Sequence, residues 1–198
     1  MTVSPPVAYY VRRLRRSVVG CLFAGANLLC AHLGIASPSV PTDVSESEVK
    51  AALVFRAAKF IDWPSRSFAD ARTPFVICVV GNADAFRAFE PLGGRTVNNH
   101  PVAVRRVTGD ALDLKQCHTA FFSQDATSDT DYALSKLQSL PVLTVGESAD
   151  FAQRGGILSL LTRDQRVRFT INLSASKQAG LAVSSQLLQL ATVVGDTP

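Results

Sequence analysis

A short, almost unbroken apolar run in the middle of the chain constrains the fold more than any other feature. Residues 74–81 read PFVICVVG and contain no charged side chain. A strand with one face in water alternates apolar and polar residues, whereas a strand buried on both faces does not. Such buried strands are typical of parallel sheets that helices cover on both sides. The run therefore predicts an α/β fold with a parallel sheet.

A helix is expected before this strand, over residues 46–61. Ser45 and Glu48 have the spacing of a capping box, and the apolar residues behind them fall on one helical stripe. Pro64 ends the helix, because proline disfavours helical backbone at the residue before it.

Strands and helices continue to alternate along the rest of the chain. The sequence predicts further strands within residues 96–108, 116–123 and 141–145, and helices at 84–92, 129–140 and 148–153. Alternation of this kind is typical of a parallel sheet whose strands are joined by crossover helices.

The pattern changes after Gly155-Gly156. Residues 157–161 and 166–173 predict two strands with a turn between them, which is an antiparallel hairpin. The last segment, 175–194, has helical spacing, with Gly180 as a candidate break. We expect a single α/β domain with a mostly parallel central sheet flanked by helices, ending in a hairpin and a C-terminal helix.

The N-terminal segment predicts a secretory signal. Four arginines lie within residues 12–16, and residues 17–35 carry no formal charge. Gly34 and Ala36 place small residues at positions −3 and −1 of a cleavage site, so cleavage is expected after Ala36. An exported protein follows from this prediction.

Two alternatives to a cleaved signal stay open. A transmembrane anchor is disfavoured by Asn27 and by the glycines of the segment. A lipoprotein signal is disfavoured because only four residues separate Arg16 from Cys21, fewer than an apolar h-region usually has. The expected organisation is a signal peptide over 1–36, an extended lead over 37–44, an α/β domain over 45–194 and a tail over 195–198.

The basic charge of the chain belongs to the signal. The chain has 20 lysine and arginine residues against 16 acidic residues, a formal charge of +4. The four arginines near the N-terminus account for the whole excess, so the mature part is formally neutral. A neutral domain gains little from counterion release, and strong binding to nucleic acid is therefore not expected.

The mature sequence contains no recognisable catalytic or cofactor motif. Neither the GxxxxGK[ST] pattern nor a GxGxxG after a strand is present, and there is no HExxH pattern. The acidic residues Asp125, Asp129 and Asp131 lack the glycine and the glutamate that a calcium loop needs. We therefore expect no catalytic residues, no cofactor and no metal ion.

Two cysteines remain after removal of the signal, Cys78 and Cys117. A single pair in an exported protein predicts a disulfide. The alternative is that Cys117 and His118 act as a nucleophile and its base. Adjacent residues of a strand point to opposite faces, which disfavours that alternative.

Two polar features stand out from the core pattern. Arg166 and Arg168 alternate with Val167 and Phe169 in the second hairpin strand, so the two arginines share one face. They form either a solvated face or a site for an acidic partner. Trp63, the only tryptophan, is either a core residue or a binding anchor.

Several short motifs together resemble the YfiR family of periplasmic proteins, in the family's order from residue 45 to residue 191. The matching residues include Lys50, Phe60, Trp63 and Pro64 near the start, the PVLTV segment at 141–145, Gly155 and Gly156, and Phe169 and Asn172 near the end. Cys117 also stands where the family tends to have a cysteine.

The chain departs from the family pattern at two places. Thr170 stands where the family commonly has glutamate, and Ala152 and Ser159 stand where some members carry an additional cysteine pair. The second departure implies that redox sensing through a second disulfide is absent here.

The resemblance implies a regulator and not an enzyme. YfiR-like proteins repress a membrane-anchored diguanylate cyclase of the YfiN type by binding its periplasmic domain, and an outer-membrane lipoprotein of the YfiB type relieves the repression. The output is cyclic di-GMP and hence biofilm and exopolysaccharide; the family also forms homodimers. We expect the contact surface to include Arg166, Arg168, Ile157 and Leu158.

The main alternative is a periplasmic small-molecule binding protein that feeds a transporter or a sensor kinase. It predicts a deep pocket and a melting temperature that rises when the pocket is filled. An exported cysteine-dependent enzyme would instead need a free thiol at Cys117.

Overall fold

The computed structural model describes residues 44–108, 111–126, 130–164 and 166–195. The chain divides into two units, Met1–Val40 and Pro41–Pro198, and every described residue belongs to the second. The predicted signal peptide, nearly all of the extended lead and most of the tail lie outside the described residues and stay predictions.

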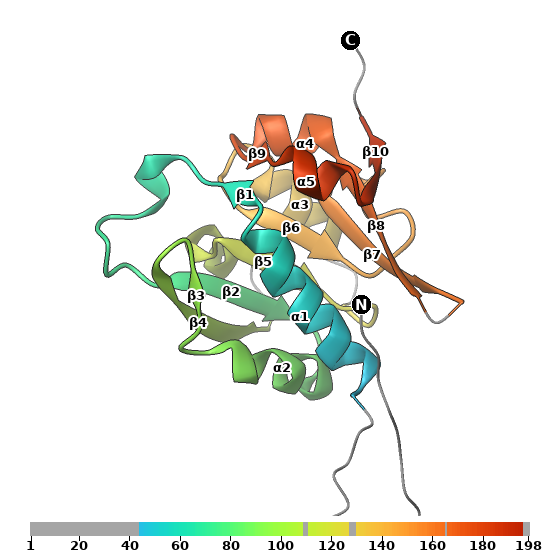
Figure 1. The fold of residues 1–198 in the computed structure, drawn as a ribbon, viewed down its shortest axis with the longest axis horizontal. Coiled ribbons are helices and arrows are strands. Elements are labelled where there is room, and N and C mark those ends of the chain that lie inside the picture. Colours follow the sequence, from blue (N-terminus) through green and yellow to red (C-terminus); the bar gives the residue numbers. More distant parts are fainter. Residues whose placement is uncertain (1–43, 109–110, 127–129, 165, 196–198) are drawn as a thin grey trace, which may run out of the picture. The chain divides into compact units, whose positions relative to one another are not determined.

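A large mixed sheet forms the centre of the domain (Figure 1). Its strands are β2 (Phe75–Val80), β3 (Thr96–Val97), β4 (His100–Val107), β5 (Thr119–Phe122), β6 (Leu143–Gly146), β7 (Leu158–Arg163), β8 (Arg166–Asn172) and β10 (Ala191–Val194). They lie in the order β10-β8-β7-β6-β5-β2-β4-β3, and neighbours are parallel except in the β7–β8 and β3–β4 pairs. A small second sheet pairs β1 (Ile61–Asp62) with β9 (Ala182–Val183). The predicted fold with a mostly parallel central sheet is confirmed.

Helices cover both faces of the large sheet. They are α1 (Glu46–Ala58), α2 (Ala83–Phe89), α3 (Thr130–Leu137), α4 (Leu173–Gln178) and α5 (Ser185–Leu188). Val54 of α1 packs in one apolar cluster with Ile77 of β2, whereas Leu134 of α3 packs in another cluster with Val76 and Cys78. Alternate residues of β2 thus face opposite layers and are buried in both, as the apolar run predicts.

The first helix begins at the expected capping box. The backbone N–H of Glu48 donates to Ser45 Oγ at 3.2 Å, and the backbone N–H of Ser45 donates to the Glu48 carboxylate at 2.8 Å. The helix is shorter than predicted, because residues 61–62 leave it to pair with β9.

The hairpin is confirmed, and the segment after it is helical only in part. β7 and β8 are antiparallel, with Arg163 directly opposite Arg166. Gly180 follows the end of α4 with a φ of +72° and makes the break that the sequence suggests. Residues 191–194 form β10 and not helix: they include β-branched residues, and they pair with the open edge of β8.

A helix is also predicted at 148–153, where the structure has turns. The ring of Phe151 lies against the backbone of Gly146 and Gly156, and a Cβ atom at these glycines would come within 2.2 and 2.1 Å of the ring. Only glycine allows so close an approach. The packing of this ring fixes the segment, whose hydrogen bonds, such as the one from Arg154 N–H to the Asp150 carbonyl, form turns and no continuous helix.

Cys78 and Cys117 form the predicted disulfide. It joins the middle of β2 to the residues just before β5, and the two cysteines are 39 residues apart in the sequence. In the chain-entropy model, a loop of this length gives a stabilisation of about 4 kcal/mol. The disulfide therefore cross-links two neighbouring parallel strands at large sequence separation.

Candidate functional site

Several strands end at the same edge of the large sheet, which we call the carboxyl edge. β2, β5, β6 and β7 run in one direction, so the residues that follow each of them lie on this edge. The chain goes from β2 to β4 on one side and then returns to β5 on the other side of β2. Open α/β sheets bind ligands at such a reversal of strand order. The fold itself thus favours a functional site at the carboxyl edge.

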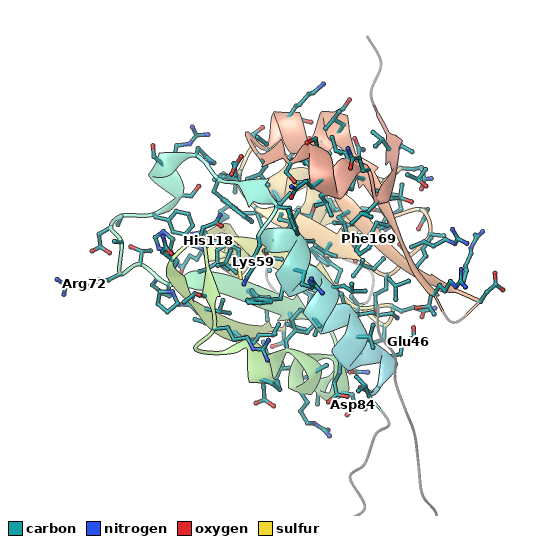
Figure 2. All side chains as sticks on the ribbon, viewed as in Figure 1. Glu46, Lys59, Arg72, Asp84, His118 and Phe169 are labelled. Carbon is teal, nitrogen blue, oxygen red and sulfur yellow. A yellow bond between two sulfur atoms is a disulfide. The ribbon has the colours of Figure 1, made fainter. Side chains whose placement is uncertain are left out.

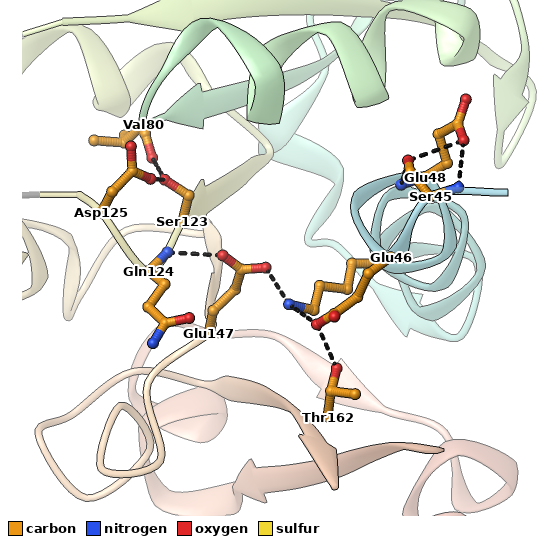
Figure 3. A network of polar contacts seen from close by, with 10 residues as sticks. Ser45, Glu46, Glu48, Val80, Ser123, Gln124, Asp125, Glu147 and Thr162 are labelled. Atoms are coloured by element: carbon orange, nitrogen blue, oxygen red, sulfur yellow. Dashed lines mark hydrogen bonds and ion pairs between the residues drawn. The ribbon is translucent and has the colours of Figure 1, made fainter. Parts of the chain in front are cut away.

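A network of charged side chains crosses the carboxyl edge (Figure 3). At its centre, Lys50 Nζ lies 2.6 Å from Glu46 Oε1 and 2.8 Å from Glu147 Oε1. Glu147 Oε2 accepts the backbone N–H of Gln124 at 2.7 Å, and Glu46 Oε1 accepts the hydroxyl proton of Thr162 at 2.7 Å. The network therefore joins α1 to the ends of β5 and β6 and to the hairpin.

Lys50 is charged although its side chain is only 11% exposed. Burial alone would lower the pKa of Lys50, but its hydrogen bonds to Glu147 and Glu46 outweigh burial and hold the pKa above its ordinary value. The hydrogen bond from Lys50 also lowers the pKa of Glu46. A charge at this depth needs its partners, so the Lys50–Glu147 pair acts as a structural tether.

An open crevice of about 540 Å³ lies beside this network. Its polar lining consists of Glu46, Ser47, Lys50, Asn82, Asp84, Ser123, Gln124, Asp125 and Glu147. Asn82 accepts the Ala85 N–H at 2.8 Å, and the Ser123 hydroxyl donates to Asp125 at 2.5 Å. These groups are held by one another, so the crevice offers a set of fixed hydrogen-bonding groups with an excess of carboxylates.

The hairpin carries arginines on one exposed face. Arg163 lies opposite Arg166, and Arg168 follows two residues later on the same side. All three side chains are exposed, and half-buried Leu161 lies opposite Arg168. We call these four residues the arginine face. Exposed guanidinium groups in a cluster are suited to bind carboxylates through paired hydrogen bonds.

Sequence reasoning predicted Arg166 and Arg168 but missed Arg163. It placed Arg163 in the turn, whereas β7 continues through this residue. The signal that could have found it is the hairpin register, because a register that pairs residue 163 with residue 166 extends the first strand through Arg163.

The structure corrects the expectation that Ile157 and Leu158 lie on an exposed contact surface. Ile157 is 3% exposed and Leu158 is 1% exposed. β7 lies between β6 and β8, and both residues belong to the apolar cluster that also contains Val54 of α1. Leu161, further along β7, is the apolar residue that reaches the surface.

Several residues of the family pattern hold the fold together. Phe60, Trp63 and Phe169 pack against the apolar core, and the Trp63 ring meets the Phe75 ring edge-on, with centroids 4.9 Å apart. Lys50 anchors the network described above. The half-buried Trp63 therefore packs against the core, which favours the first of the two alternatives left open by the sequence.

The other residues of the pattern shape turns and helix ends. Pro64 precedes a short 3₁₀ turn at Ser65–Ser67, and Gly155 has a φ of +97°. Asn172 Oδ1 accepts the Ala175 N–H at 2.9 Å, and Asn172 Nδ2 donates to the Ala152 carbonyl at 2.8 Å. Asn172 therefore caps α4 and ties it to the turn after β6.

Ala152 and Ser159 are neighbours in the structure. The Ala152 N–H donates to Ser159 Oγ at 3.0 Å, and both residues are fully buried. A hydrogen bond thus occupies the place where some family members carry a second cysteine pair.

The opposite edge of the sheet, which we call the amino edge, has a different chemistry. Figure 2 shows His118 on the opposite side of the domain from Glu46 and Asp84. The ring of Phe68 stacks between His100 and His118, with centroid distances of 3.8 and 4.5 Å. His100 is half-buried and is the first residue of β4.

His118 is held as a neutral ring. Its Nδ1 accepts the Val76 N–H at 3.1 Å, and its Nε2 donates to the Ser67 carbonyl at 3.0 Å. Burial lowers the pKa of His118, and His100 acts in the same direction. Both ring nitrogens are therefore used by the backbone, which leaves His118 no free nitrogen for catalysis.

Within the described part of the chain, no group of three or more His, Cys, Asp or Glu side chains is arranged to hold a metal ion. No helix among the same residues has the length and apolar character needed to cross a bilayer.

Comparison with known proteins identifies relatives of the domain. The model of the YfiR/HmsC-like family matches residues 47–192. A solved structure of a conserved domain protein from Vibrio cholerae O1 biovar El Tor strain N16961 matches with a TM-score of 0.50 and 14% identity, over 76% of this chain and 60% of that chain. At this identity the likeness concerns the fold alone, and this chain spans about 60% of that protein's length. No curated protein matches the chain.

Proposed function

Because this chain belongs to the YfiR/HmsC-like family, we propose that it represses a membrane-anchored diguanylate cyclase of the YfiN type by binding the cyclase's periplasmic domain. The family match over residues 47–192 is the observation that carries the proposal. The family suggests a periplasmic, non-catalytic regulator of diguanylate cyclase signalling. Repression would lower cyclic di-GMP and, with it, biofilm and exopolysaccharide.

The predicted signal peptide over 1–36 supports a periplasmic location. Cleavage after Ala36 would release a formally neutral domain with a disulfide, which suits an oxidising compartment.

The arginine face is our candidate for the contact with the cyclase. Its guanidinium groups are exposed, and Thr162 on the same hairpin is bonded to Glu46 of α1, which fixes the hairpin against the domain. The domain as a whole is neutral, so attraction to a partner would be local and short-ranged. An acidic segment of the cyclase's periplasmic domain fits this surface best.

Repression then works as a shift between two states of the cyclase. Binding favours the inactive arrangement only if the regulator binds that arrangement more tightly. A shift from 1:99 to 99:1 requires a difference of about 5.5 kcal/mol in binding free energy. A lipoprotein of the YfiB type would relieve repression by sequestering the regulator. We also propose that the regulator forms a homodimer.

The test is the intracellular concentration of cyclic di-GMP in a strain that lacks this gene. We expect deletion to raise cyclic di-GMP, wild type to restore it, and a chain without residues 1–36 to fail. The R166E/R168E variant should fail as well, whereas the K115E/K136E variant, with the same change of charge on exposed residues elsewhere, should complement.

The outcomes separate the parts of the proposal. An unchanged level on deletion would overturn repression. Full complementation by R166E/R168E would show that the arginine face is not the contact with the cyclase, and it would leave the proposal of repression unaffected.

A further inference from the structure

A small, partly enclosed cavity of about 130 Å³ lies away from the carboxyl edge. Its lining comes from α3, from α4, from the end of β8, from β6 and from the residues just before β6 and β7. Its lining residues are Leu134, Leu137, Gln138, Val142, Thr144, Gly155, Ile157, Asn172, Ser174, Ala175, Gln178 and Ala179. The apolar members come from both helices and from the sheet, so the two helices do not fill the space between them.

None of the residues that line the cavity is charged. Two of its polar groups are already engaged: Asn172 bonds to Ala175 and Ala152, and Thr144 Oγ1 accepts the Ile157 N–H at 2.9 Å. A charged ligand would find no counter-charge here and would lose its hydration. The chemistry of the lining therefore selects an uncharged ligand.

The volume sets the size of that ligand. An apolar cavity of about 150 Å³ in another protein stays dry and binds benzene. The cavity of 130 Å³ is close to this size, and its walls include the buried side chains of Leu134, Leu137, Val142, Ile157 and Ala179. A single ring or a branched chain of about six heavy atoms matches this space.

We propose that the cavity between α3 and α4 binds a small uncharged molecule whose body is apolar. This goes beyond the proposed repression, because it gives the domain a ligand of its own at a site separate from the arginine face. Asn172, which ends β8 and caps α4, lies in the cavity wall, so the site adjoins the strand that carries Arg166 and Arg168.

The experiment measures benzene binding to the mature wild-type domain by thermal unfolding and by NMR of the amides of Ala175 and Ala179. At a benzene concentration of about ten times Kd, the melting temperature should rise by about 4 °C. The A175L and A179L variants place extra carbon atoms in the cavity and should lose this shift. The A182L variant adds the same atoms at an exposed alanine and should keep it.

Each outcome decides the matter. A shift in wild type and A182L that is lost in A175L, and in A179L where that variant folds, supports the site. No shift in wild type, or the same shift in A175L as in wild type, overturns it. If A179L fails to fold, A175L and the NMR shifts of wild type still give the answer. None of these readouts depends on cyclic di-GMP, so the repression proposal can fail independently.

Discussion

Polar side chains at the two edges of the central sheet differ in charge and in their hydrogen-bond partners. At the amino edge, His118 uses both ring nitrogens on backbone groups and stacks against Phe68, with no charge on the ring. At the carboxyl edge, Lys50 and Glu147 are charged and bonded to each other, and arginines stand exposed beside them.

This difference in charge and exposure distinguishes side chains that stabilise the fold from side chains that can bind a partner. Neutral, fully bonded groups and stacked rings gain from burial and have nothing left to offer a partner. Exposed charged groups such as these arginines contribute little to stability but can bind charged groups of another molecule, whereas the buried Lys50–Glu147 pair holds the fold. We therefore expect substitutions on the disulfide and amino-edge side to change folding, and substitutions on the arginine face to change binding.

The largest effect is expected from the disulfide. The C78S/C117S variant should lose about 4 kcal/mol of unfolding free energy, because the unfolded chain regains the entropy of an open loop of 39 residues. Urea unfolding measures the loss, and wild type under reducing conditions should show the same decrease. A loss below about 1 kcal/mol would contradict the cross-link as the main support of this side.

The next effect tests the buried part of the carboxyl edge. Lys50→Met should cost about 3 kcal/mol, because the carboxylate of Glu147, with a side chain 11% exposed, loses its partner. Glu46→Gln is the control: its side chain is 57% exposed, and the change should cost less than about 1 kcal/mol.

A double variant separates a lost partner from lost packing. K50M/E147Q should recover much of the K50M loss, since it leaves no unpaired buried charge. If the double variant is as unstable as K50M in urea unfolding, packing of the lysine chain and not its charge is what matters.

The sequence predicts the strands and helices that form the two edges better than it predicts the side-chain contacts at those edges. The apolar run at 74–81 gives a strand buried on both faces, and the Ser45–Glu48 capping box gives the start of α1, because both signals are local. The Lys50–Glu147 pair joins residues almost 100 positions apart, and no local pattern brings them together.

The errors have the same cause. The burial of Ile157 and Leu158 depends on the strands beside β7, and β10 becomes a strand because the edge of β8 is open to it. Arg166 and Arg168 are found on one face as predicted, since alternation along a strand needs no distant partner. Arg163 joins them only through the cross-strand register.

A smaller effect should appear with pH at the amino edge. Burial lowers the pKa of His118 below the ordinary histidine value of 6.5; the hydrogen bond to Ser67 opposes burial, and His100 adds a smaller effect in the same direction as burial. The unfolded chain then binds the proton more readily, so the contribution of His118 to stability is present above pH 6.5 and is lost as the pH falls through the lowered pKa.

Urea unfolding of wild type and His118→Gln from pH 8 to pH 5 measures this effect. Wild type should lose more stability toward pH 5 than the variant does. Of the charged groups around the ring, Asp70 faces His100 and not His118 directly, so its titration should affect both proteins alike. If the free energies of unfolding of wild type and His118→Gln fall in parallel with pH, the lowered pKa of His118 is contradicted.

The smallest effect on stability should come from the arginine face, and it is the sharpest test of the comparison. Arg163, Arg166 and Arg168 are exposed, so reversing all three charges should change the free energy of unfolding by no more than about 0.5 kcal/mol. The same variant should lose affinity for the periplasmic domain of the cyclase by more than tenfold, measured by calorimetry against the K115E/K136E control. A variant that binds as wild type does would return these arginines to a solvated hairpin surface, the alternative that their alternation in the sequence left open. A variant that unfolds would show instead that the arginine face, like the amino edge, serves to hold the fold.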